Sequence, residues 1–229
     1  MAELTIVIPL YPQVTHLDFT GPHQVLSRVP GAKVIVASKG GVDIEAEGLV
    51  FTKLTDLADI PHCDVICVPG GFGTTAAMLD ETFMAEVTRL ASGAKYLTSV
   101  CTGSLILAAT GLITGKRAGC HWAWRDMLEP CGVIVDEARV VRDGNVITGG
   151  GVTAGLDFAF VMAAELAGET LAQSVQLGLE YSPAPPFNAG RPETAPPEIL
   201  AAVRQRMDAA GGGRLAAAQE AARRMKARA

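Results

Sequence analysis

The chain has 229 residues, of which 49% are hydrophobic, 5% aromatic and 19% charged, and its formal net charge is −5. This length suits one domain, or one domain with an appendage. The hydrophobic share excludes a disordered chain. The acidic balance argues against a nucleic-acid-binding protein, because phosphate contacts need a surplus of Lys and Arg.

The cysteines and the N-terminus restrict the cellular setting. The cysteines include no C-x-x-C pair and form no cluster of zinc ligands at short fixed spacings, so we expect no metal. The first residues lack the basic start and apolar run of a signal peptide, and no uncharged apolar run reaches the ~18 residues of a membrane span. We expect a cytoplasmic protein with free thiols. The five cysteines are Cys63, Cys67, Cys101, Cys120 and Cys131.

The first half of the chain alternates strand and helix patterns. Short, β-branched apolar runs predict strands buried on both faces. Pro22, after Asp18, suits the first turn of a helix that continues to Val29. A small hairpin is expected within the turn-rich segment 40–59. The remaining expected elements are strands over 4–10, 33–38 and 64–69, and a helix over 75–92 with its apolar residues on one face.

The second half continues this alternation. Cys101 follows a strand, stands where a helix begins, and Gly111 ends that helix. Asp143-Gly144-Asn145 supplies the turn of a hairpin. The expected elements are a strand over 95–100, a helix over 101–109, a hairpin over 139–148 and a helix over 156–167.

The composition changes after Glu180. Residues 182–197 hold six prolines, which predicts an ordered wrap or a linker. Helices are expected over 198–210 and 214–229, on either side of a glycine break. We expect the basic face of the last helix to be exposed to solvent or to pack on a partner subunit. We therefore divide the chain into a catalytic domain, 1–191, and a C-terminal helical extension, 192–229.

Strands that alternate with helices predict a mostly parallel sheet covered on both faces. Ligands of such folds collect at the carboxyl ends of the strands. Asp18, the Gly70-Gly71 turn and Cys101 are all expected at that edge.

Cys101 has the setting of a nucleophile. A strand–nucleophile–helix elbow exposes the side chain, and the helix N-terminus stabilises a thiolate and lowers the thiol pKa. We expect the other four cysteines to be small buried residues that pack in the core.

Four residues are candidates to assist Cys101. Gly70 and Gly71 allow a tight turn, and their N–H groups could face developing negative charge. Asp18 could be a helix N-cap, or a carboxyl of raised pKa that exchanges a proton with the thiol. Thr102 could cap the helix or hold a bound intermediate. A further residue, His121, stands beside Trp122 and Trp124, which favours a packed histidine over a catalytic base.

The chain resembles the ThiJ/PfpI superfamily, relatives of class I glutamine amidotransferase domains, from Leu4 to about Arg191. The motifs Leu17–Pro22, Val68–Gly71, Ser99–Ser104, His121-Trp122, Arg142–Asn145, Thr148–Gly151 and Leu179–Phe187 are similar to one branch, the isonitrile hydratases. The resemblance implies a flavodoxin-like three-layer α/β sandwich with a nucleophile elbow, and a homodimer.

The same resemblance implies a cofactor-independent hydro-lyase that converts an isonitrile to an N-substituted formamide. Cys101 would attack the isonitrile carbon to form a thioimidate. Asp18 would act as general acid and base, and Thr102 with the Gly71 backbone would hold the intermediate.

Several other activities of the superfamily fit less well. Protease-like members place His after the nucleophile, where this chain has Thr102. Amidotransferases use a His-x-Glu, whereas here Ala123 follows His121-Trp122. The alternative that stays open is a cysteine-based redox or small-molecule sensor, related to AraC-type regulators but without their DNA-binding domain. Only 38 residues (229 − 191) follow Arg191, too few for that domain.

Overall fold

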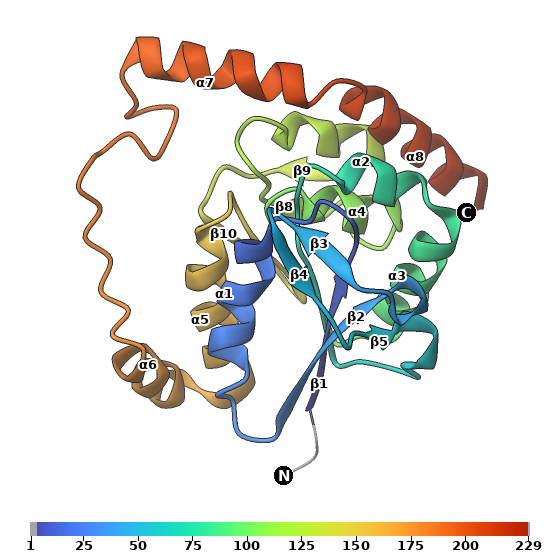
Figure 1. The fold of residues 1–229 in the computed structure, drawn as a ribbon, viewed down its shortest axis with the longest axis vertical. Helices are drawn as coiled ribbons and strands as arrows, with labels where there is room; N and C mark the ends of the chain where they lie inside the picture. The colour runs from blue at the N-terminus through green and yellow to red at the C-terminus, as the bar shows by residue number, and fades with distance from the viewer. Residues whose placement is uncertain (1–3, 229) are drawn as a thin grey trace.

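The computed structural model describes residues 4–228, which form three layers around a seven-stranded sheet (Figure 1). All neighbouring strands are parallel except the hairpin of β10 and β11 at one edge. The strands, in spatial order, are β10 (Val140–Asp143), β11 (Val146–Gly149), β7 (Tyr96–Val100), β6 (Val65–Val68), β1 (Leu4–Leu10), β2 (Ala32–Ser38) and β5 (Thr55–Asp56). The expected α/β sandwich is confirmed.

Helices cover both faces of this sheet (Figure 1). One layer contains α1 (His16–Leu26) and α5 (Ala154–Ala167), which pack against each other, and α6 (Glu169–Gly178), which packs on α5. The other layer contains α2 (Thr74–Leu79), α3 (Glu81–Gly93), α4 (Gly103–Ala109) and α8 (Arg214–Arg228).

Short elements complete the fold outside the central sheet. Two small sheets pair β3 (Ile44–Ala46) with β4 (Leu49–Phe51) and β8 (Arg117–Ala118) with β9 (Ile134–Val135). Three 3₁₀ segments cover Lys39–Gly41, Leu57–Asp59 and Arg125–Cys131. The β3–β4 hairpin is the excursion that the turn-rich segment predicts.

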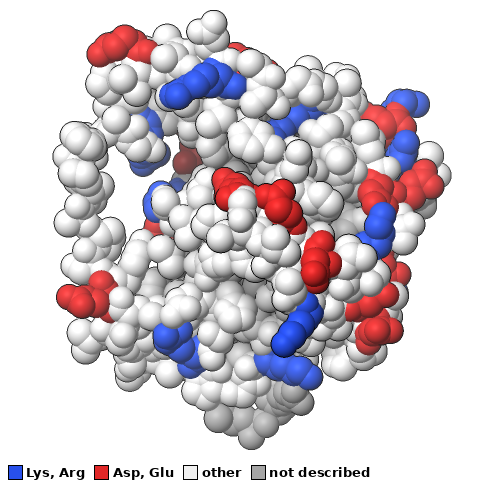
Figure 2. Space-filling model, in the orientation of Figure 1, with Lys and Arg blue, Asp and Glu red and all other residues white. Residues whose placement is uncertain are grey.

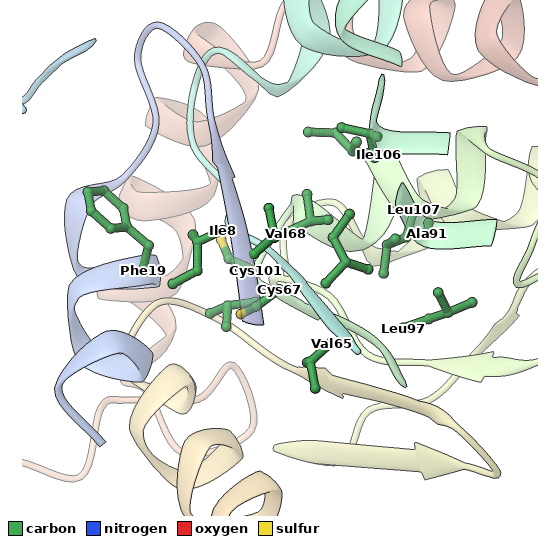
Figure 3. Packing of buried hydrophobic residues seen from close by; sticks show 14 of the residues in the cluster. Ile8, Phe19, Val65, Cys67, Val68, Ala91, Leu97, Cys101, Ile106 and Leu107 are labelled. Carbon is green, nitrogen blue, oxygen red and sulfur yellow. The ribbon is translucent and has the colours of Figure 1, made fainter. Parts of the chain in front are cut away.

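The core surrounds the middle strands. Every residue of β6 and β7 is buried, as is every residue of β1 from Ile6 onward. Figure 3 shows Cys101 within the same apolar cluster as Ile8, Cys67 and Val68. The functional edge of the sheet is therefore built on its least exposed strands.

Two helix boundaries differ from the prediction. Helix α1 begins at His16, so Pro22 lies inside it and Asp18 is in its first turn rather than at an N-cap. The predicted 75–92 helix is divided at Asp80, which has an extended backbone and whose Oδ1 accepts a hydrogen bond from the Phe83 N–H at 3.1 Å. That capping contact starts α3 afresh.

Between α6 and α7 (Pro197–Ala210), residues 182–189 run apart from the body and leave the opening at the left of Figure 2. Residues 182–190 are all exposed. Among the described residues, none of 183–190 forms a hydrogen bond with the rest of the chain. This agrees with the wrap or linker that its prolines predict.

Helix α8 corrects the expectation of a solvated basic face. It packs against α2, α4 and the 3₁₀ segment at 125–131. Ala217, Ala218, Ala221 and Ala222 are buried in this contact, and Arg214 is only 1% exposed. The small alanine side chains let the helix lie close to the body, so α8 is part of the domain's packing.

Candidate active site

Cys101 occupies a sharp turn between β7 and α4. Its backbone lies in the left-handed region, with φ of 58°, which is unfavourable for a residue with a Cβ. The Cys101 N–H donates to the carbonyls of Gly149 and Gly150, at 3.1 and 2.8 Å. On the helix side, a Cβ at Gly103 would stand 2.0 Å from the Val68 carbonyl oxygen. Glycine at that position lets α4 start directly against β6.

The sulfur is buried, contrary to the exposure expected of an elbow. Cys101 is 3% exposed and lines a cavity of about 320 Å³. Burial, and after it the nearby Asp18 carboxyl, raises the pKa of the thiol well above its usual value, although the N–H groups of Thr102 and Val152 act in the opposite direction. The expected lowering of the thiol pKa is therefore wrong, because desolvation exceeds the effect of the helix N-terminus.

Asp18 is the group next to this thiol. Its side chain is fully buried. The Oδ2 atom accepts a hydrogen bond from the Gly70 N–H at 2.8 Å, and the buried Oδ1 atom has no hydrogen-bond partner among the described residues. Burial raises its pKa to about 7, while the Gly70 N–H and the Cys101 thiol, which interacts with the same carboxyl, oppose the shift. A carboxyl of this pKa can both accept and donate a proton near neutral pH.

The glycine turn holds side chains in place. Both N–H groups that we expected to face the substrate already have acceptors, since Gly70 donates to Asp18 and Gly71 donates to Thr102 Oγ1 at 2.9 Å. A Cβ at Gly70 would lie 2.5 Å from the Thr102 nitrogen. The same Cβ would lie 2.9 Å from Asp18 Oδ2, so glycine at this position lets Asp18 and Thr102 both pack against the turn.

Thr102 belongs to a buried hydroxyl network. Its Oγ1 lies 2.7 Å from Thr74 Oγ1, and Thr74 Oγ1 lies 3.1 Å from the Tyr11 hydroxyl. Tyr11 donates in turn to the Pro69 carbonyl at 2.8 Å. The Thr102 side chain makes no capping hydrogen bond to α4, so the helix-cap alternative is not observed.

His121 lines the cavity but lacks the partners of a catalytic base. Its Nδ1 accepts from the Ala123 N–H at 3.2 Å, and its ring packs 4.8 Å from that of Trp124. Burial, with the positive charge of Arg214, lowers its pKa to about 4. The imidazole is neutral at physiological pH and forms part of the wall.

Three groups at the site were not predicted from the sequence. Arg214 comes from α8 and lines the cavity, with its guanidinium over the rings of Trp124 and Phe72. The Val152 N–H reaches the Cys101 sulfur. The run Gly149–Gly151, which carries no phosphate-loop signal, supplies the carbonyls behind Cys101 and leads the chain to Val152.

The five cysteines are all free and buried. Within residues 4–228 no group of three or more His, Cys, Asp or Glu side chains is arranged to hold a metal ion. In the same range no helix has both the length and the apolar character needed to cross a bilayer.

A family model, the DJ-1/PfpI family, matches residues 4–165. The chain belongs to the DJ-1/PfpI family. Over 204 residues it is 50% identical to the isonitrile hydratase of Pseudomonas putida, and the match covers 89% of this chain and 90% of that protein. It is also 31% identical to protein dj-1beta of Drosophila melanogaster, with 78% and 97% of the two chains covered.

Among solved structures, a ThiJ/PfpI family protein from Pseudomonas syringae matches with a TM-score of 0.91 and 40% identity. The match covers 97% of this chain and 91% of that protein. Because so much of the chain is covered, the similarity includes the C-terminal helices as well as the sheet.

The raised pKa of Asp18 predicts a pH-dependent cost in stability. Its carboxyl favours the neutral form in the folded protein, so the ionisation that occurs as pH rises from about 4 to above 7 lowers the free energy of unfolding. Asp18→Asn removes this ionisation and keeps an oxygen for the Gly70 N–H. We expect the difference in free energy of unfolding, variant minus wild type, to grow by several kcal/mol across that window.

Urea unfolding at a series of pH values measures this difference. Asp43→Asn, at an exposed acid on the surface, is the matched control and should follow the pH dependence of the wild type. A constant difference for Asp18→Asn between pH 4 and 8 would contradict the raised pKa.

Proposed function

We propose that this protein is an isonitrile hydratase, which adds water to an isonitrile to give an N-substituted formamide. The observation that carries the proposal is the buried Cys101–Asp18 pair in a chain that is 50% identical to a Pseudomonas putida protein of that name. The reaction is a hydration without a cofactor, and its chemistry rests on the chain's own thiol and carboxyl.

In the first half-reaction, the thiol adds to the terminal carbon of the isonitrile. The sulfur forms a bond to that carbon, while Asp18 takes the thiol proton and delivers it to the same carbon. The product is a thioimidate, R–N=CH–S–Cys101. Because the resting thiol has a raised pKa, proton transfer to Asp18 accompanies attack and no standing thiolate is required.

In the second half-reaction, water adds to the thioimidate carbon. Asp18 takes a proton from the water and passes it to the nitrogen, which gives a tetrahedral R–NH–CH(OH)–S–Cys101. Loss of the hydroxyl proton and cleavage of the carbon–sulfur bond release R–NH–CHO and return the proton to the sulfur. One isonitrile and one water therefore give one formamide.

The backbone and Thr102 support both steps. The N–H groups of Thr102 and Val152 face the Cys101 sulfur and stabilise negative charge that develops on it during attack and departure. The Thr102 hydroxyl, held by Gly71 and Thr74, fixes the turn that presents these donors.

The redox-sensor alternative has less support from the site. Sensor thiols are usually accessible and of low pKa, whereas Cys101 is buried and its pKa is raised. A peroxide-induced mass gain confined to Cys101, in a protein with no hydratase activity, would favour the sensor.

We also propose a cytoplasmic homodimer. Free buried thiols suit a reducing compartment. The segment 182–190 is exposed along its length, and Phe187 in it is 80% exposed, while Leu177 on α6 is 83% exposed. A second copy seated against this segment would cover both apolar side chains.

The proposed dimer predicts a mass of twice the chain in sedimentation equilibrium. Phe187→Ser together with Leu177→Ser should shift the equilibrium toward the monomer, because the interface loses apolar area. Leu215→Ser, at an exposed apolar side chain on α8, is the control. A wild type that sediments with the mass of one chain would contradict the dimer.

The proposed activity predicts formamide release from alkyl and aryl isonitriles. Cys101→Ala should abolish turnover, since no other group can carry the covalent intermediate. Asp18→Asn should lower kcat by about 10²-fold or more, as expected for loss of a general acid–base group. Cys131→Ala, which removes a buried cysteine outside the cavity, should retain activity.

Formation of formamide is followed by chromatography or infrared absorption. Absence of turnover by the wild type on every isonitrile tested would refute the hydratase. Full activity in Cys101→Ala would refute the covalent step alone.

A further inference from the structure

Arg214, in the C-terminal extension, is a charged side chain buried beside the reactive centre. It begins α8, is 1% exposed, and lines the same cavity as Cys101, Thr102 and His121. No carboxylate of residues 4–228 forms an ion pair with it. Burial of a cation without a counterion is costly, so this position calls for an explanation.

The guanidinium is held in a fixed plane. It lies 3.8 Å from the centroid of the Trp124 ring and 5.4 Å from that of Phe72. Its Nη2 donates to the Gly71 carbonyl at 3.2 Å, but the buried Nη1 has no hydrogen-bond partner. A rigid guanidinium with a free donor is prepared to bind an acceptor that the chain does not supply.

The charge balance of the cavity favours an anionic acceptor. His121 is neutral, and the pKa of Asp18 near 7 leaves that carboxyl only partly ionised at neutral pH. Glu47 stands at the rim, where its Oε2 lies 3.6 Å from His16 Nε2 and accepts from the His16 N–H at 3.3 Å. Arg214 is therefore the dominant charge inside the cavity.

A role limited to lowering the thiol pKa fits less well. The pKa of Cys101 stays well above its usual value with Arg214 in place, and burial and Asp18 govern that shift. A planar guanidinium matches the two oxygens of a carboxylate, which a thiolate does not offer. The cavity, at about 320 Å³, has room for a small molecule that reaches both groups.

We propose that Arg214 binds a carboxylate on the substrate, so that the preferred substrates are small isonitriles that carry a carboxylate close to the isonitrile group. This inference rests on the proposed hydratase activity and adds the substrate class. Arg214 then determines specificity, while Cys101 and Asp18 perform the chemistry.

The test compares isocyanoacetate with its methyl ester, which has the same reactive group without the charge. We expect the wild type to prefer the carboxylate by about 10- to 100-fold in kcat/KM, the range of a charge-assisted hydrogen bond. Arg214→Gln should bring this ratio close to one. Arg214→Lys, which keeps the charge and loses the fork, should give an intermediate ratio.

The matched control is Arg224→Gln. Arg224 is on the same helix but bonds to Glu220 and to the Leu79 carbonyl, outside the cavity. It should leave the carboxylate-to-ester ratio unchanged. A wild-type ratio near one, or a parallel loss of both activities in Arg214→Gln with the ratio retained, would overturn the inference and leave Arg214 as an anchor of α8.

A binding measurement separates this inference from the proposed activity. Calorimetry with N-formylglycine, the hydration product of isocyanoacetate, should show binding to Cys101→Ala. We expect the affinity to fall by about 10-fold or more in Cys101→Ala/Arg214→Lys, and to fall likewise when the methyl ester of N-formylglycine replaces the acid. Arg214-dependent binding without turnover of any isonitrile would refute the hydratase and keep the anion site. Turnover of isonitriles, with binding that does not depend on Arg214, would keep the hydratase and refute the anion site.

Discussion

The structure depends on burying a thiol beside a carboxyl at a strained turn. The Cys101 backbone lies in the left-handed region. Both the Cys101 thiol and the Asp18 carboxyl are buried. Strain of this kind costs about 1–3 kcal/mol and persists only where the surroundings determine it. Here the carbonyls of Gly149, at the end of β11, and of Gly150, just after it, accept from the Cys101 N–H.

Desolvation then decides the chemistry of the pair. It raises the pKa values of both groups, so that each favours its neutral form. A carboxyl with a pKa of about 7 exchanges protons readily at neutral pH, and the thiol ionises only as its proton moves. The site is therefore built for concerted addition of S–H across a carbon, rather than for a permanently charged nucleophile.

The buried strands and the nucleophile could be predicted because their signals are local. Apolar runs mark β1, β6 and β7, and Cys101 follows one of them directly. The start of α1 was missed because proline favours the first turn of a helix, whereas here Pro22 lies inside α1 although it removes a hydrogen bond and crowds the carbonyl four residues earlier. The break at Asp80 depends on one capping contact that apolar periodicity does not register.

Other features depend on contacts distant in sequence. The rise in the Cys101 pKa comes from burial and from the Asp18 carboxyl, beside a cavity lined by residues of α1, α7, α8 and loops, and no local motif reports that burial. The position of Arg214 follows from the packing of the alanines of α8 onto the body. Its stacking on Trp124 then links the C-terminal extension to the reactive centre. In the sequence this arginine is one of several basic residues in an Ala/Arg-rich helix.

The pH at which Cys101 ionises shows whether burial and Asp18 keep its thiol protonated. The ultraviolet absorbance of the thiolate is followed in the wild type, with Cys101→Ala as the background, and in Asp18→Asn, with Cys101→Ala/Asp18→Asn as the background. We expect Cys101 to ionise above the usual thiol range in the wild type, and at lower pH in Asp18→Asn because a negative neighbour is removed. A thiolate already formed at neutral pH in the wild type, or a titration unchanged by Asp18→Asn, would contradict it.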